Sequence, residues 1–431
     1  MSKNKVSFIT IFIIVVAACG YFVDIYDLIL FNVVKKDSLD ALMPGATPEA
    51  IKSMGIFLFN MQMTGMLLGG LIWGVLGDKR GRLSVLFGSI LLYSIANIIN
   101  AFVKDIPLYI VVRVLAGIGL AGELGAGVTL VSETMSKENR GYGTMILVSF
   151  GALGAVAAAL VGAKGAVIGA LLGNIFHTTF ANWQVAYLVG GTLGLFLLML
   201  RVGTIESGMF RNIQHASVNR GDLMMLFTSR ERFVKYLKCI LVGLPIWYIV
   251  GLIVANSEST WAKELNIQGQ VVNGSALMYS YIGLCVGDIF SGLLSQWLGS
   301  RRKVVIIYLA ICFTLVVWFF FFSHGSSPAV FYLLTFLLGA GTGFWALFVT
   351  VAAEQFGTNI RSTVTNTTPN FVRGSVPLIM SLFQFLISLS LSPAISAFFV
   401  GVLCMGLSFW AIATMPETFG KDLDYVEDPL V

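Results

Sequence analysis

The stretch YFVDIYDLILF, residues 21–31, places two carboxylates inside an apolar run that extends from about Phe8 to Val34. A run of that length can cross the roughly 30 Å hydrocarbon core of a bilayer as a helix. A charge near the centre of such a helix costs on the order of 3 kcal/mol or more, which makes Asp24 and Asp27 candidates for function. Because they are three residues apart, they share one helix face. We expect the function of the protein to involve that face.

The composition indicates a membrane protein. Of the 431 residues, 57% are hydrophobic and 11% are charged, whereas soluble domains carry about 25% charged residues. The formal net charge of +5 does not indicate nucleic-acid binding, because the basic residues are spread over short segments between apolar runs. The five cysteines lie far apart without a C-x-x-C pair. We therefore expect no disulfide framework, no metal and no cofactor.

Twelve apolar runs are long enough to span a bilayer. Their approximate limits are 8–34, 52–76, 84–103, 107–133, 142–163, 183–202, 236–256, 273–298, 304–322, 329–353, 363–388 and 393–414. Residues 164–182 prolong the fifth span or form a re-entrant segment. The basic start resembles a signal peptide, but the apolar run continues past Asp27, so a retained first helix is expected. Most lysines and arginines outside the spans fall on the side of the N-terminus, which predicts that both termini are cytoplasmic.

Internal repeats divide the chain into two halves. GVLGDKRGR (74–82) matches GLLSQWLGSRR (292–302), and SETMSKENR (132–140) matches AEQFGTNIR (353–361) at nearly the same offset, about half the chain length. We predict an all-α membrane protein with twelve transmembrane helices in two pseudo-symmetric six-helix bundles, residues 1–203 and 236–431. The polar segment 204–235 is expected to be a cytoplasmic linker, whose second part forms a surface helix or stays a solvated connection.

The loop between the second and third spans resembles the signature of the major facilitator superfamily, and PETFGKDL (416–423) resembles the tail of its sugar porters and their relatives. The resemblance implies transport by alternating access. It also implies that charged residues from both repeats form a latch between the halves on the cytoplasmic side; an ordinary charged turn is the alternative. The residues concerned are Gly74, Asp78, Arg80, Gly81, Arg82, Glu133, Arg140, Glu354 and Arg361.

Two further segments resemble metabolite:proton symporters of that superfamily. DIYDL (24–28) resembles the Asp-x-Tyr-Asp-Leu of aromatic-acid and phosphate symporters. AGELGAG around Glu123 resembles the Gly-Gly-Glu segment of metabolite:proton symporters and, more distantly, the Gly-Gly-Asp segment of phosphate:proton symporters. The Tyr-Pro of the phosphate group is missing, which argues against phosphate. The resemblance implies proton coupling by Asp24, Asp27, Glu123 and Arg113, and a substrate contact by Tyr26. The alternatives are a structural carboxylate and an Arg113 that extends to the outer headgroups.

Arg373 lies twelve residues after Arg361, about 18 Å further along a helix, near mid-membrane. Asn366, Asn370 and Arg373 form one polar stripe, which is expected to face a cavity. In aromatic-acid and phosphate symporters a basic residue at this distance is the anion ligand; a structural pairing of Arg373 with a carboxylate is the alternative. Trp345 is a candidate cavity wall, as are the aromatic residues Trp247, Tyr248 and Phe344, and Asp288 is a candidate arginine partner.

These observations predict a proton-coupled symporter of a small anionic or zwitterionic metabolite, such as a carboxylate or an amino acid. The alternatives are a phosphate or sugar symporter of the same fold, or a non-transporting sensor, although only about 17 residues follow the last span. An aspartyl hydrolase requires carboxylates from different helices, so we expect no enzyme. The expected partners are protons, the small-molecule substrate and the lipid bilayer. The expected state is a monomer in a bacterial inner membrane.

Overall fold

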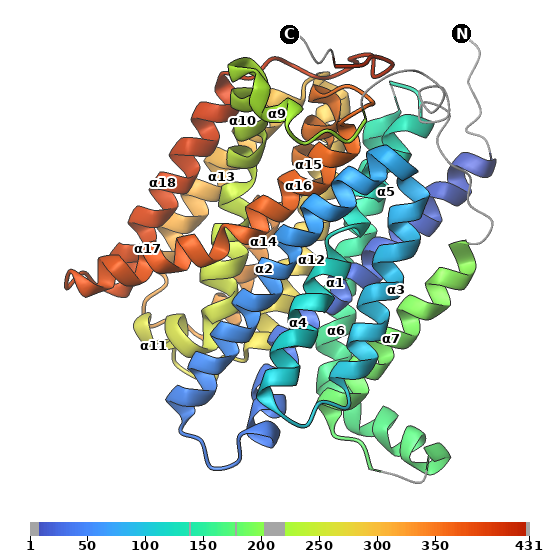
Figure 1. Ribbon diagram of the computed structural model, residues 1–431. Coiled ribbons are helices and arrows are strands. Elements are labelled where there is room, and N and C mark those ends of the chain that lie inside the picture. The colour runs from blue at the N-terminus through green and yellow to red at the C-terminus, as the bar shows by residue number, and fades with distance from the viewer. Residues whose placement is uncertain (1–7, 138, 177–178, 202–219, 428–431) are drawn as a thin grey trace.

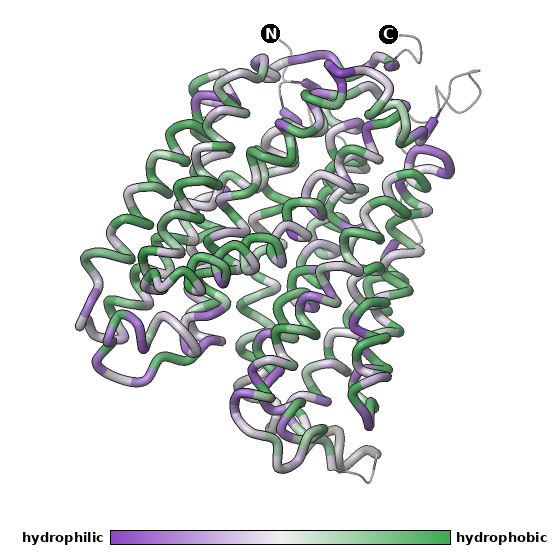
Figure 2. Tube along the Cα trace, turned by 60° about the vertical axis from the view of Figure 1, so that its left-hand side comes forward, coloured by the Kyte–Doolittle hydropathy of each residue, from purple (hydrophilic) through white to green (hydrophobic). Residues whose placement is uncertain are grey.

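The computed structural model describes residues 8–137, 139–176, 179–201 and 220–427. Within these ranges all regular secondary structure is helical, and twelve helical spans are long and apolar enough to cross a membrane. The predicted number of spans and the all-α class are confirmed. Hydrophilic residues gather at the two ends of the molecule, and hydrophobic residues cover the middle (Figure 2). This distribution is the one a bilayer requires, because backbone polar groups must be satisfied internally within hydrocarbon.

The first bundle contains the spans before the central linker (Figure 1). Its helices are α1 (Phe8–Leu42), α2 (Pro48–Arg80), α3 (Arg82–Asn100), α4 (Ile106–Leu120), α5 (Glu123–Thr134), α6 (Arg140–Phe176) and α7 (Asn182–Leu200). The helix α6 continues through most of the ambiguous segment 164–182, so that segment prolongs the fifth span and is not re-entrant up to Phe176.

The second bundle follows the short helix α9 (Met225–Thr228). Its helices are α10 (Arg230–Trp247), η2 (Tyr248–Ile253), η3 (Val254–Asn256), η4 (Ser257–Trp261), α11 (Ala262–Glu264), α12 (Asn273–Leu298), α13 (Arg301–Phe322), α14 (Pro328–Gly341), α15 (Trp345–Gln355), α16 (Arg361–Gly374), α17 (Val376–Ser388) and α18 (Pro393–Ala413). Because α10 begins at Arg230, the seventh span starts inside the segment expected to be linker.

Four spans are interrupted near their middle. The fourth breaks between α4 and α5, the tenth between α14 and α15, and the eleventh at Ser375 between α16 and α17. The seventh changes to π-helix at Tyr248, just after Pro245, whose ring removes a backbone donor. Discontinuous helices and π-helical turns are typical of binding sites in transport proteins. The four breaks therefore indicate a binding site near the middle of the molecule.

The two bundles meet along two helix pairs, α2 with α16 and α6 with α12. They lie together at the end where α1 begins and the chain leaves α18, and they diverge toward the opposite end (Figure 2). We call these ends the terminal side and the distal side. The pairing of the second span with the eleventh, and of the fifth with the eighth, is pseudo-symmetric, as the sequence repeats predict.

After α18, the PETFG segment caps another helix of the same bundle. The Glu417 carboxylate accepts hydrogen bonds from the Ser300 hydroxyl and from the backbone N–H of Arg301 at 2.9 Å, at the start of α13. Partial desolvation opposes ionisation, but these bonds and those from the backbone of Thr418 and Phe419 outweigh it and hold the pKa of Glu417 below its usual value. The tail motif thus has a structural role on the terminal side.

Candidate functional site: a cavity between the bundles

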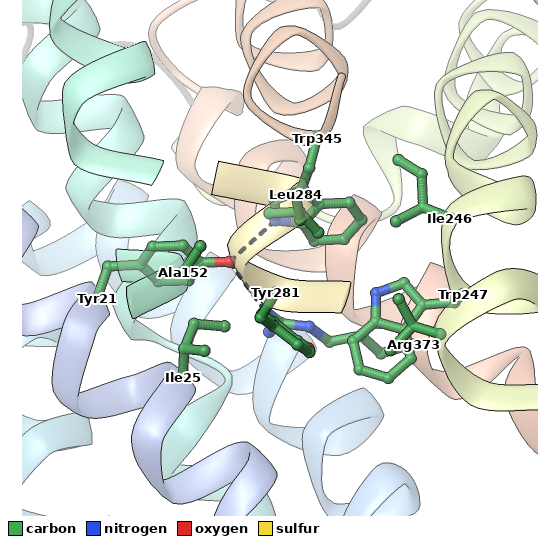
Figure 3. A pocket seen from close by; sticks show the side chains of 10 residues that line it. Tyr21, Ile25, Ala152, Ile246, Trp247, Tyr281, Leu284, Trp345 and Arg373 are labelled. Atoms are coloured by element: carbon green, nitrogen blue, oxygen red, sulfur yellow. Dashed lines mark hydrogen bonds between the residues drawn. The ribbon is translucent and has the colours of Figure 1, made fainter. Parts of the chain in front are cut away.

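A small cavity lies between the two bundles, at the level of the interrupted spans. The space holds no more than about 320 Å³. Residues from α1, α6, α10, η2, α12, α15 and α16 line it, and most of its wall is apolar or aromatic (Figure 3). The lining residues are Tyr21, Ile25, Ala152, Ile246, Trp247, Val250, Tyr281, Leu284, Trp345 and Arg373. A concave apolar space with a few converging polar groups is the usual form of a small-molecule site.

Arg373 is the only charged residue among those lining residues. Its Nη2 donates to the Tyr21 hydroxyl at 3.4 Å and its Nη1 to the Asn370 Oδ1 at 3.3 Å. Its guanidinium carbon lies 5.5 Å from the ring centre of Trp345 and 5.8 Å from that of Trp247. Arg373 Nε has no hydrogen-bond partner among the described residues. A buried guanidinium held by aromatic rings retains donors for an anion.

Within the described chain, none of the ion pairs formed at 4.0 Å or less involves Arg373. The alternative of a structural salt bridge for this residue is therefore not supported. Tyr21 is a pocket residue that the sequence analysis missed. Its hydroxyl accepts from Trp345 Nε1 at 2.9 Å as well as from Arg373 (Figure 3). A signal was available, since Tyr21 stands three residues before Asp24 on the same helix face.

Asp24 and Asp27 are both buried, with 0% and 1% of their surface exposed. Among the described residues, neither carboxylate accepts a hydrogen bond of 3.5 Å or less, although the Asn97 side chain lies beside Asp27. Arg373 and Glu123 are the charged neighbours of Asp24, and Asp24 and Arg113 those of Asp27. An unpaired buried carboxylate is costly when charged, so these two groups are not explained by packing. Asp27 also lies against α7, where a Cβ on Gly190 would come within 2.1 Å of its Oδ1.

Arg113 points into the first bundle and is fully buried, so it does not extend to the headgroups. Its Nη1 donates to Gln62 Oε1 and to the Tyr187 hydroxyl, both at 3.4 Å. Its guanidinium carbon lies 5.1 Å from the ring centre of Phe31 and 5.3 Å from that of Tyr187. Tyr26 lies outside the cavity lining; its hydroxyl donates to the Ala186 carbonyl at 3.0 Å. The substrate contact expected for Tyr26 stays a prediction.

Glu123 has a partner that the sequence analysis missed. The side chain of Arg201, at the end of α7, extends into the bundle and donates to both carboxylate oxygens of Glu123; the bond to Oε2 is 3.0 Å long. The same guanidinium also donates to the Leu86 carbonyl at 2.8 Å. Both side chains are buried. Gly20 on α1 packs directly against this pair, one turn before Asp24. In the sequence Arg201 stands at the end of a span, where a basic residue is expected to meet headgroups, and only the tertiary structure shows that its side chain turns toward Glu123.

The two asparagines of α16 do not line the cavity, and one of them, Asn370, forms a hydrogen bond to the first bundle. Asn370 Nδ2 donates to the Ala121 carbonyl at 2.8 Å, at the break between α4 and α5. Asn366 Nδ2 donates to the Ser362 carbonyl at 2.9 Å, within its own helix. Within the predicted polar stripe, Asn370 therefore contacts the guanidinium of Arg373, whereas Asn366 does not. Asp288 caps α15 by accepting from the Ala346 N–H at 2.9 Å, so the expectation of an arginine partner was wrong.

On the terminal side, charged residues of both repeats form two clusters. Glu133 accepts from Arg82 at 2.8 Å and from Arg361 of the other bundle at 3.0 Å. In the related cluster, Glu354 lies 3.5 Å from Arg301 and 4.0 Å from Arg140 of the other bundle. All six side chains are buried. Each glutamate thus pairs with one arginine from its own bundle and one from the other.

The loop between α2 and α3 adds a helix cap to these clusters. Asp78 accepts from the backbone N–H of Ser362 at 3.0 Å and of Thr363 at 2.7 Å, at the start of α16. A Cβ on Gly74 would come within 2.9 Å of the Thr363 backbone, and Gly81 adopts φ +100°, which favours glycine. Arg80 is exposed. A carboxylate at a helix N-terminus is favourable, so Asp78 holds the bundles together here.

Replacing Glu133 by glutamine should separate the bundles on the terminal side. The change leaves Arg82 and Arg361 buried without their shared countercharge, at a cost of about 3–5 kcal/mol. The spin-label distance between Lys79 and Lys303, both exposed on this side, should then gain a longer component. Arg80→Gln, in the same loop but exposed, is the matched control and should keep the short distance. An unchanged distance in Glu133→Gln would contradict the role of this cluster.

A membrane-embedded pair of bundles with a charged cavity between them defines a membrane transport protein. The profile described as Major Facilitator Superfamily matches residues 17–369. The chain belongs to the Major Facilitator Superfamily. It is a transport protein and not an enzyme, as the sequence analysis predicted.

Two transporters share about a quarter of their aligned residues with this chain. The niacin transporter NiaP of Acinetobacter baylyi is 25% identical over 338 residues, which are 71% of this chain and 72% of that protein. The 3-(3-hydroxy-phenyl)propionate transporter of Escherichia coli is 25% identical over 255 residues, 58% of each chain. The solved proton:xylose symporter XylE of E. coli aligns with a TM-score of 0.74 at 17% identity, covering 96% of this chain and 98% of its own. This last likeness concerns the fold.

Proposed function

We propose that this protein is a proton-coupled symporter of a small aromatic monocarboxylate and works by alternating access. The observation that carries the proposal is Arg373, a buried guanidinium between two tryptophan rings with no carboxylate of the described chain in salt-bridge distance. A carboxylate is the natural ligand of such a fork. The names of the relatives support this substrate class, since niacin and 3-(3-hydroxyphenyl)propionate are both aromatic acids.

The cavity wall supports an aromatic substrate better than a sugar. Trp247 and Trp345 offer ring faces or edges, and Tyr21 and Tyr281 provide hydroxyl groups. A sugar needs a hydrogen-bond partner for most of its hydroxyls, whereas the wall is otherwise aliphatic. A planar acid would place its carboxylate on Arg373 and its ring against the tryptophans. Trp345 and Arg373 are thus the substrate ligands of the proposal, and Asn370 positions Arg373.

Proton coupling is assigned to Asp24 and Asp27, with Arg113 and Glu123 as charged neighbours. Both aspartates are buried without a hydrogen bond of 3.5 Å or less in the described chain, and Arg373 is the main charged neighbour of Asp24. Protonation would neutralise the site as the substrate anion arrives. The terminal-side clusters would then hold the cytoplasmic end closed while the bundles rock about the cavity. The proposal includes a monomer in a bacterial inner membrane, with the terminal side cytoplasmic.

The substrate class is tested by thermal stabilisation of the purified protein. Benzoate and nicotinate should raise the unfolding temperature, because a ligand that binds only the folded state stabilises it. Nicotinamide has the same ring without the charge and should give a much smaller shift; xylose and phosphate should give none. The nicotinate shift should disappear in Arg373→Ala. Stabilisation by xylose that persists in Arg373→Ala would contradict the anion site.

A further inference from the structure

Three buried hydroxyl groups form a continuous hydrogen-bonded chain in the first bundle. The Ser38 hydroxyl lies 3.2 Å from that of Tyr109, and the Tyr109 hydroxyl lies 2.7 Å from that of Tyr187. Arg113 Nη1 donates to the Tyr187 hydroxyl at 3.4 Å. Ser38, Tyr109, Tyr187 and Arg113 each have 0% of their surface exposed. The chain joins α1, α4 and α7, and the function proposed above does not use it.

The chain leads from the distal side toward Asp27. Ser38 stands one turn before the distal end of α1, Tyr109 in the first turn of α4, and Tyr187 in the second turn of α7. Gly190, which Asp27 contacts, lies three residues after Tyr187, on the same face and about 4.5 Å further along α7. The relay proposed below needs one bridging water molecule for this step. With that water, the three hydroxyls would connect to the Asp27 carboxylate.

We propose that Ser38, Tyr109 and Tyr187 relay protons from the distal side to Asp27. The proposal rests on the proton symport proposed above. Ser38 is itself buried, so a passage begins when the distal end of α1 opens to water. A proton then joins the Ser38 oxygen, each hydroxyl passes its own proton inward, and Tyr187 gives its proton to the Asp27 carboxylate. Each O–H bond that breaks is replaced by one formed on the same oxygen. The three residues end unchanged in composition, and Asp27 ends neutral.

The directions of the hydrogen bonds fit this sequence. The Ser38 hydroxyl donates to the Lys35 carbonyl at 3.0 Å, and an arginine can only donate. With both ends fixed, Tyr109 must donate to Ser38, and Tyr187 to Tyr109. The hydroxyls of Tyr109 and Tyr187 are then turned toward Ser38 and the distal side, which is the arrangement left after a proton has passed them inward, whereas the Ser38 hydroxyl turns back to the Lys35 carbonyl of its own helix. The guanidinium of Arg113 beside Tyr187 favours transient negative charge on that oxygen, which assists the transfer to Asp27.

Replacing Tyr109 by phenylalanine tests the relay. The variant keeps the ring and its edge contacts with Phe31 and Tyr187 but removes the central hydroxyl. Net uptake driven by a pH gradient in proteoliposomes should slow on the order of tenfold or more, as expected when a proton-transfer group is lost. Exchange of labelled for unlabelled substrate across the membrane needs no net proton movement and should keep its rate.

Tyr308→Phe is the control, because it removes a buried tyrosine hydroxyl that donates to the Gly287 carbonyl in the other bundle. Its net uptake should match that of the native protein. Equal loss of net uptake and exchange in Tyr109→Phe, or loss of neither, would overturn the relay. Asp27→Asn separates this failure from that of the proposed function. If Asp27→Asn and Asp24→Asn both still accumulate substrate, proton symport through this helix is wrong. If Asp27→Asn loses accumulation and Tyr109→Phe behaves as native, the relay alone is wrong.

Discussion

Replacing Arg373 by alanine is expected to lower the affinity for benzoate or nicotinate by at least about a hundredfold. The guanidinium is the only cation among the described residues that line the cavity, and losing one partner of a buried, hydrogen-bonded charge pair costs about 2–5 kcal/mol. At about 1.4 kcal/mol for each factor of ten, the middle of that range exceeds a hundredfold. Titration calorimetry of the purified protein with nicotinate measures the change directly.

The variant Arg373→Lys separates the effect of the positive charge from the effect of the planar guanidinium. Arg373→Lys keeps the charge but loses the planar fork that binds two carboxylate oxygens, and its ammonium stacks less well between Trp247 and Trp345. Its affinity for nicotinate should fall between those of the native protein and Arg373→Ala. Nicotinamide provides the reference, since its weak binding should change little in either variant. An affinity for nicotinate that survives in Arg373→Ala would place the anion elsewhere.

The sequence predicted those features that depend on hydropathy, repetition and charge within a span. Twelve apolar runs and two repeats were enough for the two bundles, because a bilayer allows few other solutions. Arg373 could be placed near mid-membrane by counting residues from Arg361, and the structure puts it in the cavity wall. The terminal-side latch was implied by the resemblance of the loop between the second and third spans to the superfamily signature, and the repeats added Glu354 and Arg361 to it. The structure brings these groups together across the bundles.

Features that depend on which helix faces meet were missed. Arg201 occurs at the end of a span, where basic residues usually meet headgroups, and nothing in its local sequence indicates that it turns back to Glu123. Asp288 has the same apolar context as Asp24, yet it caps the broken tenth span. The hydroxyls of Tyr109 and Tyr187 are far apart in sequence, and both read as ordinary membrane aromatics. Contacts between distant residues of this kind require the tertiary structure.

Replacing Asp27 by asparagine is expected to abolish accumulation of substrate under an imposed inward pH gradient while leaving exchange intact. Asparagine is close in size to a protonated aspartate, so the variant imitates the loaded, neutral site but cannot release a proton. The carboxylate accepts no hydrogen bond of 3.5 Å or less in the described chain, so no structural bond is lost, and the unfolding temperature should change by little. Transport assays on proteoliposomes, with and without the gradient, measure both activities in one preparation.

Comparing Asp24→Asn with Asp27→Asn shows which of the two carboxylates carries the coupling proton and which influences substrate affinity. Asp24 has Arg373 as its main charged neighbour, whereas Asp27 contacts α7 beside Gly190 and lies near Arg113. Removing the charge of Asp24 leaves Arg373 with less competition for the substrate, so nicotinate should bind Asp24→Asn at least as tightly as the native protein. The affinity of Asp27→Asn should change less. If Asp27→Asn accumulated substrate and Asp24→Asn did not, the coupling proton would belong to Asp24, on the same face of α1 but next to the substrate anion.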